Sequence, residues 1–178
     1  TPAAAVALAD DLARLMDDMT TRQVGWKAFD KLVPDDLDEY WQRTLDFLKF
    51  VEPFWRGILD ERGAIEQAAR RDRLIEAEAK RLAGSDAPVI AAGSTGSMPA
   101  TAKLLATIAR LKQGAVVLPG LDTDLDDASW QTIAGNTDDK THHGAPASGH
   151  AQFAMQALLA TLGIARNEVE PLAEPTPH

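Results

Sequence analysis

The order of short apolar runs within residues 88–118 constrains the fold of this chain more than any other feature. Residues 89–92 read Val-Ile-Ala-Ala and residues 115–118 read Ala-Val-Val-Leu, and short apolar runs of this kind are typical of buried strands. Between them, residues 99–112 have a helical pattern that opens with a proline. Because a strand, a crossover helix and a second strand bring the two strands side by side, the pattern predicts a parallel pair.

Helical periodicity dominates the residues before this element. One amphipathic stripe runs from Leu8 to Met19, and a wider one, rich in aromatic residues, runs from Leu37 to Ile58. The wider stripe is apolar on two faces, so we expect its helix to be buried between neighbours. Pro53 should kink or restart that helix, because proline removes one backbone donor and crowds the preceding turn. A further helix is expected over residues 64–83.

These patterns predict an α/β protein that is mostly helical, with an N-terminal helical bundle followed by a small parallel β-α-β element. We expect a helical subdomain over residues 1–87, the β-α-β element over 88–135, a flexible loop over 136–150, a C-terminal helix over 151–170 and a tail over 171–178.

Composition narrows the classes of function. The formal net charge is −9, which argues against a stand-alone surface for nucleic acid or anionic lipid. The chain has no cysteine, so disulfides, thiolate zinc sites and cysteine-ligated iron–sulfur clusters are excluded. No apolar run reaches the roughly 18 residues that a membrane span needs, and we expect a cytoplasmic protein. The chain starts inside a helical pattern and without Met, which suggests a piece of a longer protein.

The turn after the first expected strand is the first candidate site, and it consists of Gly93, Ser94, Thr95, Gly96 and Ser97. A Gly-rich turn before a helix can bind phosphate through backbone N–H groups. The P-loop pattern fails here, because its second glycine falls on Met98 and its lysine on Pro99. The favoured interpretation is that the glycines simply turn the chain.

Ser94 is also a candidate nucleophile. Residues 92–96 read Ala-Gly-Ser-Thr-Gly, close to the G-x-S-x-G elbow of hydrolases. In hydrolases with this elbow the catalytic residues follow along the chain in the order Ser, Asp, His. Here Ser94 is followed by Asp122 and then by the histidines His142, His143 and His150. The helix begins only at Pro99, whereas an elbow places its serine at the helix start. A small serine hydrolase therefore remains an alternative.

Two segments suggest metal binding but lack the required ligands. Residues 122–127 carry aspartates at positions 1, 3 and 5 of a calcium loop, yet Asp127 and Ile133 stand where glycine and glutamate are needed. The histidines of residues 142–150 have no partner at helical spacing. We expect no metal site and no cofactor.

The densest basic cluster is formed by Arg70, Arg71 and Arg73. It is a candidate contact for a phosphate backbone. Acidic neighbours offset its charge, so a solvated helix face is the favoured interpretation. These neighbours are Glu66, Asp72, Glu76 and Glu78.

Three stretches together resemble one family. The first stretch is YWQRTLDFLKFVEPFWRGILDERG (residues 40–63), followed by RRDRLIEAEAKR (residues 70–81). The second runs over residues 88–130, from PVIAAGSTGSMPATAKLL through DTDLDDASW. The third is HAQFAMQALLATLGIARNEVEP (residues 150–171). They are similar to the alphaproteobacterial type of AddB, the helicase-like and nuclease-bearing subunit of the AddAB double-strand break repair complex. Where relatives tend to carry His-Pro-Gln, residues 150–152 read His-Ala-Gln.

The resemblance implies an internal fragment of such a subunit. Its strand-helix-strand element would be part of a degenerate superfamily-one helicase core, with small residues around Ala92, Gly93 and Ser94 in place of the Asp-Glu pair that holds magnesium. The helices before it would belong to an inserted helical subdomain. The family's iron–sulfur and nuclease elements would lie elsewhere, since cysteine is absent here.

The expected function is therefore a non-catalytic scaffold for DNA handling and for pairing with an AddA-like motor subunit. We expect no membrane association, no small-molecule substrate and no catalysis within these residues. The alternatives are the serine hydrolase with Ser94 as nucleophile and a free-standing helical interaction module.

Overall fold

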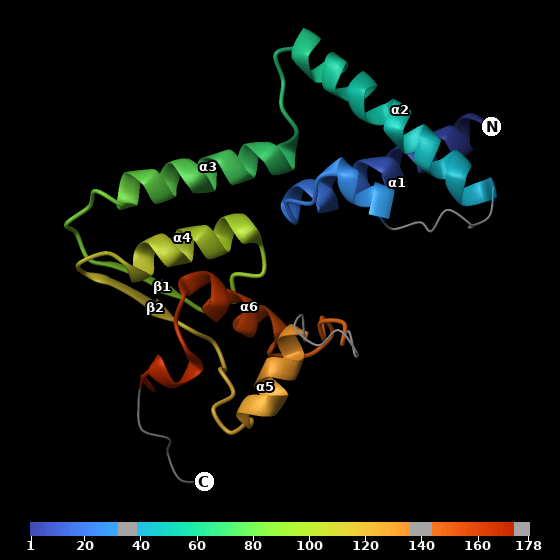
Figure 1. Cartoon of the computed structure of the whole chain (residues 1–178). Coiled ribbons are helices and arrows are strands. Elements are labelled where there is room, and N and C mark those ends of the chain that lie inside the picture. Colours follow the sequence, from blue (N-terminus) through green and yellow to red (C-terminus); the bar gives the residue numbers. More distant parts are fainter. Residues whose placement is uncertain (32–38, 136–143, 173–178) are drawn as a thin grey trace. The chain divides into compact units, whose positions relative to one another are not determined.

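The structure is a computed structural model that describes residues 1–31, 39–135 and 144–172 (Figure 1). Its described elements are mostly helical, with one two-stranded parallel sheet, as the sequence predicts. The expected loop at 136–150 and tail at 171–178 lie partly outside the described residues. In chain order the elements are α1 (Pro2–Thr21), η1 (Trp26–Lys31), α2 (Glu39–Glu61), α3 (Gln67–Leu82), β1 (Val89–Ala92), α4 (Pro99–Ala109), β2 (Gly114–Val117), α5 (Asp127–Ala134), α6 (Phe153–Leu162) and η2 (Arg166–Glu168).

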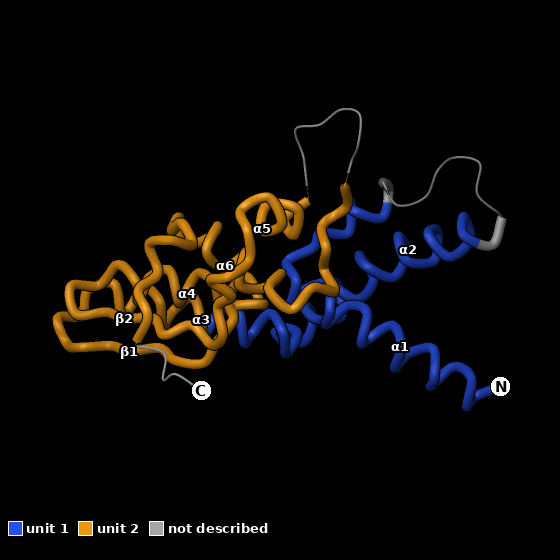
Figure 2. Tube along the Cα trace, turned by 90° about the horizontal axis from the view of Figure 1, so that it is seen from below, with its two compact units in different colours: residues 1–74 blue, residues 75–178 orange. Residues whose placement is uncertain are grey.

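The chain divides into two compact units, Thr1–Leu74 and Ile75–His178 (Figure 2). The division falls inside α3, whereas the expected helical subdomain extends to residue 87. Arg71 in the first turns of α3 donates to Thr21 of α1, and Glu66, just before α3, accepts from Trp55 of α2, so the start of α3 belongs to the first unit.

Helix α1 begins where the sequence supplies a cap. The Thr1 hydroxyl oxygen accepts a hydrogen bond from the Ala4 N–H at 3.3 Å, and Pro2 occupies the first helical position. The expected apolar stripe is buried only in the second half of the helix. Met19 is buried and Leu12 half-buried, while Leu8 is 57% exposed.

Helix α2 departs from two expectations. It runs without a break through Pro53, so the expected restart is wrong. Pro53 is exposed, and its ring therefore meets solvent while the helix gives up one backbone hydrogen bond. Burial on two faces is also wrong, because the described elements cover only one face: Leu48 is buried, whereas Phe50 and Phe54 are 65% and 61% exposed and stack on each other.

The second unit contains the predicted β-α-β element. Strands β1 and β2 pair in parallel, with Val89 opposite Gly114 and Ala92 opposite Val117. Helix α4 connects them and packs on both strands and on α6, and α5 packs on the other side of α6 (Figure 1). The core of this unit consists of Ala102, Leu105, Ala106, Trp130, Ile133, Met155, Leu158, Leu159 and Leu162.

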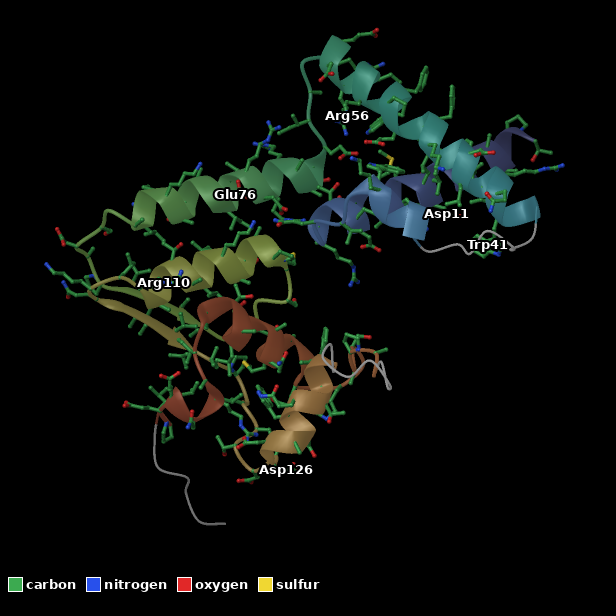
Figure 3. All side chains as sticks on the ribbon, in the orientation of Figure 1. Asp11, Trp41, Arg56, Glu76, Arg110 and Asp126 are labelled. Atoms are coloured by element: carbon green, nitrogen blue, oxygen red, sulfur yellow. The ribbon has the colours of Figure 1, made fainter. Side chains whose placement is uncertain are left out.

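Capping residues explain where the last helices begin and end. Asp126 lies at the start of α5 (Figure 3), where its carboxylate accepts hydrogen bonds from the Ser129 N–H at 2.9 Å and the Ser129 hydroxyl at 2.7 Å. Gly163 ends α6 with a φ of 71°, which suits glycine. No helix within the described ranges is long and apolar enough to cross a membrane.

Candidate functional site

The Gly-Ser turn lies at the carboxyl end of β1 and leads into α4, as its sequence predicts. Gly93 and Gly96 have φ values of 78° and 59°, which glycine adopts at little cost. The Gly93 N–H donates to the Val117 carbonyl at 3.1 Å and so extends the pairing of the two strands. The backbone N–H of Gly93 is thus used within the sheet.

Gly96 is fixed by packing as well as by its backbone angle. A Cβ atom at this position would lie 2.7 Å from Leu158 Cδ1 and 3.3 Å from Leu105 Cδ1, both in the core. The Gly96 N–H donates to the Ser94 hydroxyl oxygen at 3.2 Å, which closes a local turn. Chain reversal and close packing therefore account for both glycines without a ligand.

The turn offers hydroxyl groups but no carboxylate. Thr95 and Ser97 complete it, half-buried and exposed respectively. Within residues 1–31, 39–135 and 144–172, no group of three or more His, Cys, Asp or Glu side chains could hold a metal ion.

The members of the proposed Ser-His-Asp arrangement are each engaged locally. The Asp122 carboxylate accepts from the N–H groups of Asp124 at 2.9 Å and Leu125 at 3.0 Å. His150 Nδ1 accepts from the Gln152 N–H at 3.2 Å, and Ser94 accepts from Gly96. His142 and His143 lie outside the described residues. The hydrogen bonds of Ser94, Asp122 and His150 thus stabilise three separate turns.

The three arginines of the basic cluster have different environments at the start of α3. Arg70 and Arg73 are exposed. Arg71 is half-buried; its Nη2 donates to the Thr21 hydroxyl oxygen at 2.7 Å, and its Nε lies 3.5 Å from Asp72 Oδ1. Arg71 therefore joins α3 to the end of α1, which leaves Arg70 and Arg73 as the better candidates for an outside contact.

Glu66, one of the acidic neighbours of the arginine cluster, also joins two helices. Its carboxylate accepts from Trp55 Nε1 at 3.0 Å and from the Thr20 hydroxyl at 3.4 Å. Farther along α3, Glu78 binds Arg81 with two hydrogen bonds, which lower the pKa of Glu78. Glu66 thus joins the start of the α3 segment to α1 and α2, whereas Glu78 forms an ion pair within α3 itself.

Sequence reasoning missed a cavity built around Arg166. The guanidinium lies over the Trp130 ring, 5.1 Å from its centroid, and its Nη2 donates to Asp127 Oδ1 at 2.7 Å. The Arg166 side chain is only 13% exposed, whereas Asp127 is 93% exposed. The cavity measures about 540 Å³ and is lined by Thr123, Asp127, Trp130, Gln131, Gln156, Leu159, Ala160, Ile164, Ala165, Arg166, Asn167 and Val169.

Gln152 is a second residue whose role the sequence does not reveal. Its side-chain amide donates to the Gly120 carbonyl at 2.9 Å, and its side-chain oxygen accepts from the Asp122 N–H at 3.2 Å. Gln152 thus fixes the loop that follows β2. Gln152 ends the His-Ala-Gln stretch of residues 150–152, but its hydrogen-bond partners lie about 30 positions earlier in the chain. Those of Arg166 are also distant, so only the tertiary structure identifies these contacts.

Comparison of the chain with protein-family models, with curated proteins and with solved structures found no match. Membership in the AddB family therefore stays a proposal that rests on the three stretches of sequence.

Proposed function

We propose that this chain is a non-catalytic part of an AddB-like subunit, and that it serves in the cytoplasm as a helicase-like scaffold during double-strand break repair. In this proposal the parent subunit handles DNA and pairs with an AddA-like motor subunit. One observation carries the proposal: the turn at the carboxyl end of β1, residues 93–97, has glycine and hydroxyl residues where an active superfamily-one helicase would have metal-binding carboxylates.

The chemistry of the turn supports this interpretation. Phosphoryl transfer needs a cation held by at least one carboxylate, which hydroxyl ligands supplement, and a group that orients the attacking water. At this turn the N–H groups of Gly93 and Gly96 bind a carbonyl and a hydroxyl of the protein itself. The turn is therefore suited to connecting β1 with α4 and poorly suited to hydrolysing a nucleotide.

Charge limits where DNA could be contacted. The net charge of −9 disfavours binding of a phosphate backbone over a large surface, so an interaction would have to be local. Arg70 and Arg73 are exposed on α3 and are our candidates for such a contact.

A thermal-shift measurement with ATP and magnesium tests the absence of a working nucleotide site. We expect an unchanged melting temperature, whereas a working site at a ligand concentration of 100 Kd would add about 2.7 kcal/mol. A saturable rise would contradict the proposal. The hydrolase alternative is tested in parallel with a fluorophosphonate probe: labelling that disappears in Ser94→Ala would favour that alternative.

A second experiment tests the DNA and partner roles. Fluorescence anisotropy with a labelled duplex carrying a single-stranded end should show salt-sensitive binding that weakens in the double variant Arg70→Glu/Arg73→Glu. The matched control is Lys80→Glu, which changes the charge of another exposed position on α3. Absence of both DNA binding and co-purification with an AddA-like subunit, in the chain and in its native longer product, would overturn the proposal.

A further inference from the structure

The outer edge of β2 has unpaired backbone groups. The Val89 N–H donates to the Gln113 carbonyl and the Gly93 N–H to the Val117 carbonyl, so the odd-numbered residues of β2 direct their backbone groups toward β1. Because direction alternates along a strand, the N–H and C=O of Val116 face away from β1. Among the described residues, neither group of Val116 has a hydrogen-bond partner.

A groove lies against this edge. It measures about 310 Å³ and is lined by residues of β2, α6 and the segment that follows α6. Its apolar lining includes Val116, Leu118, Leu159, Leu162, Ile164 and Val169. An unpaired strand edge beside an apolar groove is the combination that binds extended peptides: the backbone pairs with the edge and alternate side chains enter the groove.

The charged residues of the groove have one sign. Glu168 and Glu170 line it and are exposed, and no basic side chain is among its lining residues. Arg110 donates to the Leu162 carbonyl at 3.4 Å but does not line the groove. An occupant that places basic side chains opposite Glu168 and Glu170 is therefore favoured over an acidic one.

We propose that a partner polypeptide adds an extended strand to the edge of β2, with alternating apolar and basic side chains. The apolar side chains fill the groove over Leu159 and Leu162, and the basic ones lie opposite Glu168 and Glu170. Backbone hydrogen bonds to Val116 fix the position of the strand. This inference does not depend on the DNA-repair proposal, because it uses only the edge, the groove and its charge.

The opposite edge of the sheet provides the comparison. Ile90 and Ala92 of β1 are also exposed, and Ile90 is 70% exposed. However, neither residue is among those that line the groove, which include Glu168 and Glu170. A strand could pair with β1 through its backbone alone, without the apolar and charged contacts that the β2 edge offers.

The test uses the whole chain and a fluorescein-labelled peptide, Lys-Val-Lys-Val-Lys-Val, in an anisotropy titration. Two altered peptides separate the contributions: one is N-methylated on alternate residues and lacks backbone donors, and the other has Glu in place of Lys. We expect both to bind at least about tenfold more weakly than the parent peptide. Equal binding of all three peptides would overturn the proposal.

Protein variants then locate the site. Val116→Pro removes the outward N–H and Glu170→Lys reverses one charge; each should weaken binding, whereas Ala92→Pro and Glu76→Lys serve as matched controls and should not. Since Val116→Pro could disturb β2, hydrogen exchange of the wild-type chain gives a second measurement, in which the peptide should slow exchange of the Val116 amide. Loss of binding in Ala92→Pro but not in Val116→Pro would assign the strand to β1 and contradict the proposal.

Discussion

At the scale of single residues, the two glycines of the turn differ in what a side chain would meet. Both have positive φ, but an added Cβ finds open space at Gly93 and the core leucine Leu158 at Gly96. We expect Gly93→Ala to cost about 1 kcal/mol of unfolding free energy through backbone strain. Gly96→Ala should cost about 3 kcal/mol, because overpacking adds to that strain.

Urea unfolding of both variants measures the difference. The comparison also bears on the proposed function, since a turn shaped by packing needs Gly96 whether or not a ligand binds. Equal destabilisation by the two substitutions would show that the contact with Leu158 is unimportant.

At the scale of elements, α5 depends on a cap that titrates. Hydrogen bonds from the Ser129 hydroxyl and N–H lower the pKa of Asp126 below its ordinary value. A carboxylate with a lowered folded-state pKa stabilises the fold above its unfolded-state pKa of about 3.9, and this contribution is lost as the pH falls through the lower, folded-state value. We expect Asp126→Asn, which keeps a cap acceptor but cannot titrate, to make unfolding less dependent on pH between about 5 and 3.

Thermal unfolding followed by circular dichroism across this pH range measures the effect. Ser129→Ala is the matched control, because it removes the hydroxyl donor while the Asp126 carboxylate keeps the backbone N–H. It should reduce the pH dependence less than Asp126→Asn does. If the unfolding of Asp126→Asn depended on pH as strongly as that of the wild type, the Asp126 carboxylate would not be the source of the pH dependence.

At the scale of the whole molecule, each unit has its own buried residues. Leu158 is 1% exposed in the core of the second unit, and Leu48 is 7% exposed in the first. We expect Leu158→Ala to cost about 3 kcal/mol and to increase hydrogen exchange in α4 and α6 more than in α1 and α2. Leu48→Ala should give the opposite distribution.

Hydrogen exchange followed by mass spectrometry measures protection in the two units separately. Only peptides that span α3 contain residues of both units. An equal loss of protection throughout the chain in both variants would mean that the units unfold together. The exposed aromatic residues Phe50 and Phe54 would not alter this expectation, since they contribute little to the core of either unit.

The sequence by itself determined the elements whose signals are local. The parallel pair, its crossover helix and the last helix follow from runs of apolar residues and from periodicity. These features depend on residues within a few positions of one another, so a linear pattern contains them.

Only the tertiary structure decided which faces are covered and which distant side chains meet. The aromatic residues of α2 indicated a buried helix, but burial depends on what packs against a face, and the described neighbours cover one face alone. The contact of Arg166 with Trp130 and Asp127, and that of Glu66 with Trp55 and Thr20, join residues far apart along the chain. Such pairs arise from how the helices pack, and no spacing along the sequence records that packing.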